Sequence, residues 1–231
     1  IAIAEQVGDQ PDKGIFSREV VRVVTPGTVV EPGLLPSAKN NYLASVYIQE
    51  NKAGIAYLDV TTGEFAGTQI EGEDVQAQVR SELMRINPSE TLHSEAQVLG
   101  NSLPGTQTPV PNWYYEPGRA EELMKSVFGV SSLDGYGLHD QGLTVQAAGA
   151  LLKYLQETRR DALKALSGFT TYSLADFMVL DAETRRNLEL TETLRENKVE
   201  GSLLSVLDNT RTPMGKRLLR QWVSQPLLDL A

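Results

Sequence analysis

The sequence has no cysteine and only two histidines, His93 and His139, among its 231 residues. This composition excludes a disulfide scaffold, a thiolate metal site, a cysteine nucleophile and a histidine-rich metal centre. No apolar run approaches the roughly 20 residues that a membrane-spanning helix needs, so we expect a soluble chain without a membrane partner. The lack of cysteine and of a secretory signal is typical of a cytoplasmic protein.

Basic side chains are in the minority, with 21 Lys and Arg against 30 Asp and Glu and a net charge of -9. This balance argues against a surface devoted as a whole to nucleic acid. Residues 210–225 are a local exception, because they include no acidic residue. Their cations form what we call the basic patch: Arg211, Lys216, Arg217 and Arg220. The patch could contact a phosphate backbone, but we favour pairing with the acidic stretch 183–200.

Phosphate-binding loop motifs are also missing. The sequence contains neither the Walker pattern Gly-x-x-x-x-Gly-Lys-Ser/Thr nor the order Gly-x-Gly-x-x-Gly, even in its glycine-rich stretch 129–142. We therefore expect no cofactor in this chain and any nucleotide site outside it. The apolar start at Ile1, without a methionine, and the apolar end at Ala231 suggest a piece of a longer protein.

The first 40 residues predict two strands and a linker. Residues 1–7 and 19–24 are strand-like, and the turn-forming stretch 8–14 separates them. Thr25, Pro26 and Gly27 are expected to form an interdomain turn of type II, in which a glycine takes a positive φ. The prolines of residues 26–40 then favour an extended linker.

Residues 41–166 have the pattern of an α/β domain. Strands are predicted at 42–50, 55–60 and 64–70, and their short turns indicate an antiparallel meander. Further elements are expected in the following order: a helix at 74–86 capped by Asp74, a strand near Thr91, a loop at 100–111, a strand at 113–115 and a helix at 119–128. A meander followed by alternating helices and strands is typical of a ribonuclease H-like sheet, and a generic α+β sandwich is the alternative.

The remaining residues predict an all-α segment. One helix is expected over 145–166, a short one capped by Ser173, and another from Asp181 to Leu194. Further helices are predicted after Ser202 and over 214–223 with Thr212 as N-cap. The last two helices carry apolar residues that expect partner helices. These residues should either pack onto a second copy of the chain or leave the helices mobile: Leu203, Leu204, Leu207, Leu218 and Trp222.

Few residues suggest chemistry. Asp59 and Glu64 flank a Thr-Thr-Gly turn, and with Asp74 or Glu82 they could hold the metal of a ribonuclease H-like nuclease. The first strand lacks a carboxylate, however, so we favour turn chemistry for Asp59. For two other groups we also favour structural interpretations: a solvated helix entry for His139-Asp140 rather than an acid–base pair, and an edge strand for Trp113-Tyr114-Tyr115 rather than a base-stacking platform.

Six ordered blocks of the sequence together resemble the MutS family of DNA mismatch repair proteins. They are REVVRVVTPGT (18–28), NYL (41–43), YLDVTTGEF (57–65), AGALLKYL (148–155), LDAETRRNLEL (180–190) and DNTRTPMGKRLL (208–219). One short block would mean little, but the order and spacing of all six match from end to end.

The resemblance implies a domain map and a role. Residues 1–25 would be the end of the mismatch-binding domain, 26–40 a linker, 41–166 the ribonuclease H-like connector domain, and 167–231 the start of the helical core and lever domain. The fragment would be non-catalytic, without the family's Phe-x-Glu wedge or Walker ATPase. It would couple mismatch binding to the ATPase and offer a docking surface to a MutL-type protein. ATP, Mg²⁺ and mismatched duplex DNA would bind elsewhere on a homodimeric parent.

Overall fold

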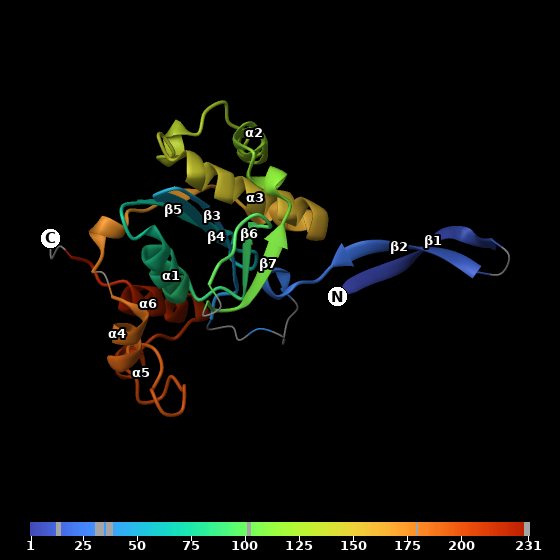
Figure 1. The fold of residues 1–231 in the computed structure, drawn as a ribbon. Coiled ribbons are helices and arrows are strands. Elements are labelled where there is room, and N and C mark those ends of the chain that lie inside the picture. The colour runs from blue at the N-terminus through green and yellow to red at the C-terminus, as the bar shows by residue number, and fades with distance from the viewer. Residues whose placement is uncertain (13–14, 31–34, 36–38, 101–102, 179, 229–231) are drawn as a thin grey trace.

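A mixed six-stranded sheet forms the centre of the molecule in the computed structural model, which describes residues 1–12, 15–30, 35, 39–100, 103–178 and 180–228 (Figure 1). The strand order is β7-β6-β3-β4-β5-β8. The strands are β3 (Tyr42–Gln49), β4 (Lys52–Asp59), β5 (Glu64–Glu71), β6 (Glu90–Ser94), β7 (Thr106–Val110) and β8 (Thr170–Thr171).

The strands β3, β4 and β5 confirm the predicted meander. β3 pairs with β4 and β4 with β5, both antiparallel, whereas β6 runs parallel to β3 and to β7. The strand expected near Thr91 is β6. The loop predicted at 100–111 is wrong in part, since it contains β7. Pairing with β6 supplies the backbone hydrogen bonds of this strand, although its sequence pattern only weakly indicates a strand.

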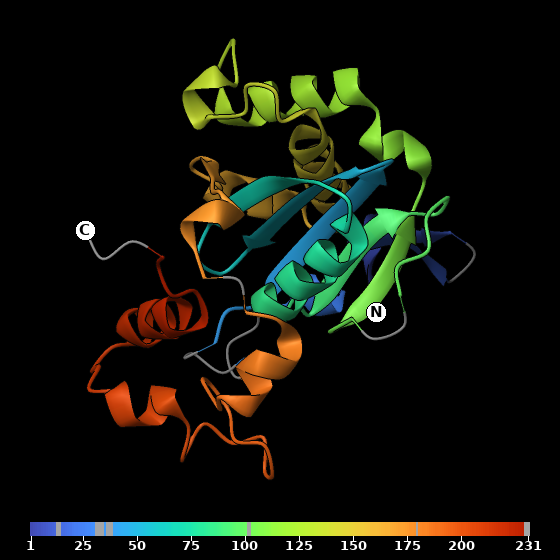
Figure 2. The same cartoon turned by 60° about the vertical axis from the view of Figure 1, so that its left-hand side comes forward.

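Helices cover both faces of the sheet (Figures 1 and 2). On one face lie α3 (Gly142–Thr158) and α2 (Pro117–Phe128), and on the other lies α1 (Val75–Ile86). The layers approach closely: a Cβ on Gly54 of β4 would lie 2.0 Å from the backbone oxygen of Leu143 in α3. The helices predicted at 74–86 and 119–128 are confirmed by α1 and α2. The predicted cap is confirmed too, because Asp74 accepts a hydrogen bond from the Ala77 amide.

An N-terminal hairpin extends away from the sheet (Figure 1). It consists of β1 (Ala2–Asp12) and β2 (Ile15–Val23), which pair antiparallel, so the strands run into the residues predicted as a loop. A short 3-10 helix, η1 (Pro26–Thr28), follows and buries Gly27 and Thr28. The expected extended linker is therefore wrong at its start, and 31–34 and 36–38 lie outside the described residues.

The long helix predicted over 145–166 is wrong in its last eight residues. α3 ends at Thr158, Arg159 leaves the helical conformation with φ -154°, and the 3-10 helix η4 (Arg160–Ala165) follows. The cause is a cation in the apolar stripe. The Arg159 guanidinium donates to the backbone oxygen of Thr28 at 3.1 Å, which satisfies a cation that an apolar core would not accept.

The strand expected at Trp113–Tyr115 is a 3-10 helix, η2 (Asn112–Tyr115). Turning the chain here brings the Tyr115 ring onto that of Tyr47, with 4.7 Å between ring centroids. The Tyr115 hydroxyl also lies 3.1 Å from the Ser45 hydroxyl. Burial of this ring, 1% exposed, outweighs the strand preference of three consecutive aromatic residues.

The C-terminal residues are less helical than predicted. They begin with β8, which pairs with β5, and continue with the 3-10 helix η5 (Leu174–Asp176) capped by Ser173. The three helices that follow are α4 (Ala182–Asn187), α5 (Leu203–Leu207) and α6 (Pro213–Ser224). The expected N-caps Asp181, Ser202 and Thr212 are confirmed by side-chain hydrogen bonds to backbone amides.

The helix expected to reach Leu194 ends at Asn187. Beyond it Glu189 has a positive φ of 46°, and its backbone oxygen and that of Leu190 accept hydrogen bonds from the first amides of α5. These long-range bonds replace the helical ones. No helix in the described residues is long and apolar enough to span a bilayer.

Candidate functional site at the two junctions of the sheet

The hairpin is attached to the sheet through Glu90, a fully buried carboxylate on β6 that is 1% exposed. One of its oxygens, Oε2, accepts the Gly27 amide at 3.0 Å. The other, Oε1, accepts the hydroxyls of Tyr154 at 2.7 Å and Thr108 at 2.8 Å. Burial raises the pKa of Tyr154 above its usual value, so the phenol remains a donor. We call this contact between η1 and Glu90 the N-terminal junction.

The expected interdomain turn, Thr25 to Gly27, is the centre of this junction but is not a type II turn. The Thr28 amide donates to the Thr25 backbone oxygen at 3.0 Å, which closes a 3-10 turn, and the two hydroxyls bond to each other at 3.0 Å. Gly27 is not among the residues with positive φ. A Cβ there would instead lie 2.7 Å from Leu43 Cδ1, so glycine is needed for space rather than for backbone freedom.

We predict that Glu90→Gln lowers the free energy of unfolding by about 1–3 kcal/mol. A glutamine that keeps its oxygen toward Tyr154 turns an NH₂ group toward the Gly27 amide, which leaves two donors facing each other. Chemical denaturation measures the loss, and hydrogen exchange at the Gly27 amide locates it. The exposed Glu95→Gln is the matched control. Equal stability of the two variants would contradict the proposed anchor.

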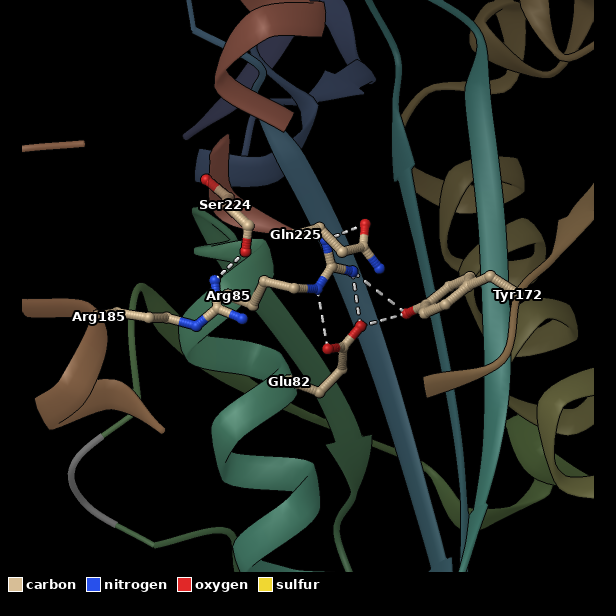
Figure 3. A network of polar contacts seen from close by, with 6 residues as sticks. All are labelled: Glu82, Arg85, Tyr172, Arg185, Ser224 and Gln225. Atoms are coloured by element: carbon tan, nitrogen blue, oxygen red, sulfur yellow. Dashed lines mark hydrogen bonds and ion pairs between the residues drawn. The ribbon is translucent and has the colours of Figure 1, made fainter. Parts of the chain in front are cut away.

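The C-terminal helices are attached through a second polar network, centred on Glu82 and Arg85 of α1 (Figure 3). Arg85 donates to both carboxylate oxygens of Glu82, from Nε at 2.9 Å and from Nη2 at 2.6 Å. The two side chains are only 8% and 4% exposed, respectively. Tyr172 donates to Glu82 at 2.5 Å, and Arg85 Nη1 reaches Gln225 Oε1, just past α6, at 3.4 Å.

The charge of Arg85 is maintained despite burial. Burial lowers the pKa of Arg85, but the adjacent Glu82 carboxylate more than offsets this, and the pKa lies well above its usual value. The guanidinium also lies 5.5 Å from the ring centroid of Tyr172. A buried, bidentate ion pair of this kind fixes the orientation of both partners.

A second arginine extends the network into α4. Arg185 donates to the backbone oxygen of Leu180 at 3.0 Å and to that of Ser224 at the end of α6. Figure 3 shows Arg185 beside Arg85, between α1 and α6. Burial, and then the neighbouring Arg85, lower the pKa of Arg185. We call the contacts of Glu82, Arg85, Tyr172, Arg185 and Gln225 the C-terminal junction.

The carboxylates considered for a nuclease all have other roles in the structure. Asp59 is fully buried, and its two oxygens accept bonds from the Thr61 amide at 2.8 Å and the Asn41 amide at 3.1 Å. This confirms the interpretation as turn chemistry. Glu64 accepts the Tyr42 hydroxyl at 2.9 Å. Asp74 caps α1 and Glu82 pairs with Arg85. No three His, Asp or Glu among the described residues are placed to hold a metal ion together.

The two histidines do not belong to a shared site. His93 is buried and lies within 3.0 Å of the Ser94 backbone oxygen through Nδ1. His139 and Asp140 are 80% and 89% exposed, which confirms a solvated entry to α3. Trp113 is 44% exposed and lies beside Lys153, with 5.4 Å between the amine and the ring centroid.

The basic patch is divided between different environments. Arg220 Nη1 lies 3.8 Å from Oε1 of Glu192, which belongs to the acidic stretch. Lys216 Nζ lies 4.0 Å from Oδ2 of Asp208, which lies outside that stretch. Arg217 turns inward, and its buried Nε has no partner among the described residues. Arg211 is exposed. Contact with DNA therefore remains a prediction.

The apolar residues expected to need a partner are mostly exposed, with one exception. Leu204 is 4% exposed and therefore part of the core, because the start of α5 bonds to the backbone of Glu189 and Leu190. The exposed fractions of the others are 44% for Leu203, 47% for Leu207, 45% for Leu218 and 64% for Trp222.

Sequence reasoning found the turn at Thr25–Gly27 but missed the buried contacts that form both junctions. Glu90 and Tyr154 are 64 positions apart, and Arg85 and Gln225 are 140 apart. The one available signal was the spacing of Glu82 and Arg85, which places an acid and a base on one face of α1. It could not indicate burial, because the same spacing is common on exposed helices.

Three family profiles match successive parts of this chain. The profile described as MutS domain II matches residues 41–167, more than half of the chain. MutS domain I matches residues 1–32 and MutS domain III matches 183–231. The chain belongs to the MutS family. The N-terminal junction thus joins the domain I match to the domain II match, and the C-terminal junction joins the domain II match to the domain III match.

Relatives agree with this assignment over the whole chain. A protein of Syntrophomonas wolfei is 44% identical over 238 residues, which cover 99% of this chain and 28% of the relative. One of Dehalococcoides mccartyi is 42% identical over 231 residues, covering 99% and 26%, respectively. One of Trichodesmium erythraeum is 41% identical over 250 residues, covering 100% and 27%. Each is named DNA mismatch repair protein MutS, and this chain spans about a quarter of their length.

Proposed function

We propose that this chain is the non-catalytic connecting part of a MutS-type DNA mismatch repair protein. In this proposal it couples mismatch binding to the ATPase and offers a docking surface to a MutL-type partner. One observation carries the proposal: the segments before and after the sheet are both attached to it by buried polar side chains. A closely packed layer with directed contacts on both sides transmits a displacement rather than absorbing it.

The proposed domain map follows the same junctions. Residues 1–25 end the mismatch-binding domain, 26–40 link it, 41–166 form the connector domain, and 167–231 open the helical core. We also propose that the connector is ribonuclease H-like. Its antiparallel meander, followed by the parallel strands β6 and β7, supports this assignment.

The proposal places the reactive groups and most partners elsewhere in the parent. ATP and Mg²⁺ bind its ATPase, mismatched duplex DNA binds its other domains, and the parent acts as a cytoplasmic homodimer. Within the basic patch, Arg211 and Lys216 are the two exposed cations and could therefore contact a DNA backbone. Charge reversal at these two positions should reduce the salt dependence of DNA binding if they contact phosphates.

The coupling is tested by introducing Glu90→Gln into the full-length parent. We expect mismatch binding and basal ATP hydrolysis to persist, because neither site lies in this chain. The stimulation of hydrolysis by mismatched DNA should fall about fivefold or more, since the N-terminal junction no longer holds the turn rigidly. Glu95→Gln is the control. Unchanged stimulation, with the variant folded, would contradict the proposed coupling.

The nuclease alternative has its own test. Incubation of the chain with Mg²⁺ or Mn²⁺ and an RNA–DNA hybrid should leave the hybrid intact, because the Asp59 oxygens are engaged by backbone amides. Cleavage that Asp59→Asn abolishes would overturn the non-catalytic assignment.

A further inference from the structure

A cavity of about 290 Å³ lies where the sheet domain meets the C-terminal helices. The rings of Tyr42 and Tyr57 line its sheet side, and residues of α4 and α6 line the opposite side. The cations around it come from four parts of the chain: Lys39, Arg85, Arg185, Arg186, Arg217 and Arg220. This concentration stands out in a chain whose net charge is -9.

The acids around the cavity do not balance these cations. Among the described residues that line it, Glu192 is the one carboxylate, and Lys39 at 2.8 Å and Arg220 at 3.8 Å share it. Arg85 is paired with Glu82, which lies outside the lining. Arg185 bonds to two backbone oxygens, which are neutral.

One further acid is near but already engaged. Glu64 accepts hydrogen bonds from Tyr42 at 2.9 Å and from Asn40 at 3.2 Å. Burial raises the pKa of Glu64, whereas the charges of Arg85 and Arg217 act against this shift, so the carboxylate offsets part of the charge on both arginines. Burial also lowers the pKa of Arg220 despite the nearby Glu192. Positive charge at the cavity is therefore only partly compensated.

Arg217, which lines the cavity, has an unsatisfied donor. Its Nε is buried and has no hydrogen-bond partner among the described residues. A buried donor without an acceptor costs about 1–3 kcal/mol, and it costs more when the group is charged. An anion that draws the Arg217 guanidinium toward the cavity would give Nε an acceptor and remove that cost.

We propose that this cavity binds a phosphate group, either as inorganic phosphate or as the phosphates of a nucleotide. Guanidinium groups match the oxygens of phosphate in planar, bidentate pairs, and several of them can share a doubly charged anion. The site is assembled from side chains of separate elements, which is why no phosphate-loop motif marks it in the sequence. A volume of about 290 Å³ favours a small ligand over a duplex.

Such a ligand would bridge the sheet domain and the C-terminal helices. Lys39 and Arg85 line the cavity from before and within the sheet domain, and Arg185, Arg217 and Arg220 line it from the C-terminal helices, so binding would favour the C-terminal junction as the structure has it. The inference stands without the proposed role in mismatch repair, because it depends only on the cavity and its charges.

The test measures binding of inorganic phosphate, ADP and adenosine to the 231-residue chain by calorimetry, with chloride at matched ionic strength as the reference. We expect phosphate or ADP to bind and adenosine not to bind. Tighter binding of ADP identifies a nucleotide as the ligand, and equal binding identifies free phosphate. Thermal unfolding should shift upward with the concentration of the ligand that binds.

Arg217→Gln should weaken phosphate binding about tenfold or more, because the charged guanidinium of Arg217 and its donors are lost. Arg217→Lys keeps the charge without the planar fork and should weaken it less. Arg195→Gln, an exposed site of equal charge change outside the cavity, is the control, and circular dichroism verifies that each variant is folded. Three results would overturn the proposal: no binding beyond chloride, equal loss in the control, or Arg217-dependent binding of duplex DNA alone.

Discussion

Arg85→Met should lower the free energy of unfolding by about 3–5 kcal/mol, because it leaves the Glu82 carboxylate buried without its cation. Tyr172 and Gln225 lose a partner at the same time. The stability is measured by chemical denaturation. Hydrogen exchange should accelerate in α4 and α6 more than in α3, since those two helices are attached to the sheet through this network.

A double-mutant cycle separates the ion pair from simple packing. In the variant Glu82→Gln with Arg85→Met no buried charge is left unpaired, so we expect part of the lost stability to return. The exposed pair Lys52 and Glu71, which are 48% and 51% exposed, provides the control cycle, and its coupling should be under about 1 kcal/mol. Equal coupling energies in the two cycles would refute a special role for the C-terminal junction.

Gly54→Ala should destabilise the chain by about 3 kcal/mol or more, a comparable loss from a different cause. The new Cβ would lie 2.0 Å from the Leu143 oxygen and 2.5 Å from the Thr144 amide nitrogen. These are backbone atoms of α3, so no side chain can rotate away, and the helix itself must shift from the sheet. Thermal and chemical unfolding measure the effect.

Gly118→Ala is the matched control for this substitution. Gly118 lies in α2 and a Cβ there would meet no atom within 4 Å, so alanine should stabilise the helix by up to about 1 kcal/mol. The two variants therefore change stability in opposite directions. Equal unfolding temperatures for Gly54→Ala and Gly118→Ala would contradict the close contact between β4 and α3.

The two junctions attach the sheet layer to the segments before and after it. Glu90 holds η1 on β6, and the Glu82–Arg85 pair holds the C-terminal helices on α1, which packs on the sheet face opposite α3. Both junctions contain buried charged groups, so displacing a partner leaves a buried charge unsatisfied. Each junction is therefore costly to distort, which is consistent with the relay between domains that we propose.

The local features of the fold follow from the sequence. The meander from Tyr42 to Glu71, the Asp74 cap of α1 and the Thr212-Pro213 start of α6 depend on residues within one turn or hairpin of each other. Their hydrogen bonds close over short spans, so residue types and spacing are enough to predict them. The family resemblance was equally accessible, because it rests on ordered blocks of sequence.

Tertiary contacts determined the rest. α3 ends where Arg159 finds the Thr28 oxygen, α4 ends where the start of α5 bonds to Glu189, and β8 exists because β5 offers an edge. The burial of Glu90 and of the Glu82–Arg85 pair was not predictable in the same way. Whether a charge is exposed or enclosed depends on which distant segments cover it, and that is fixed only when the whole chain packs.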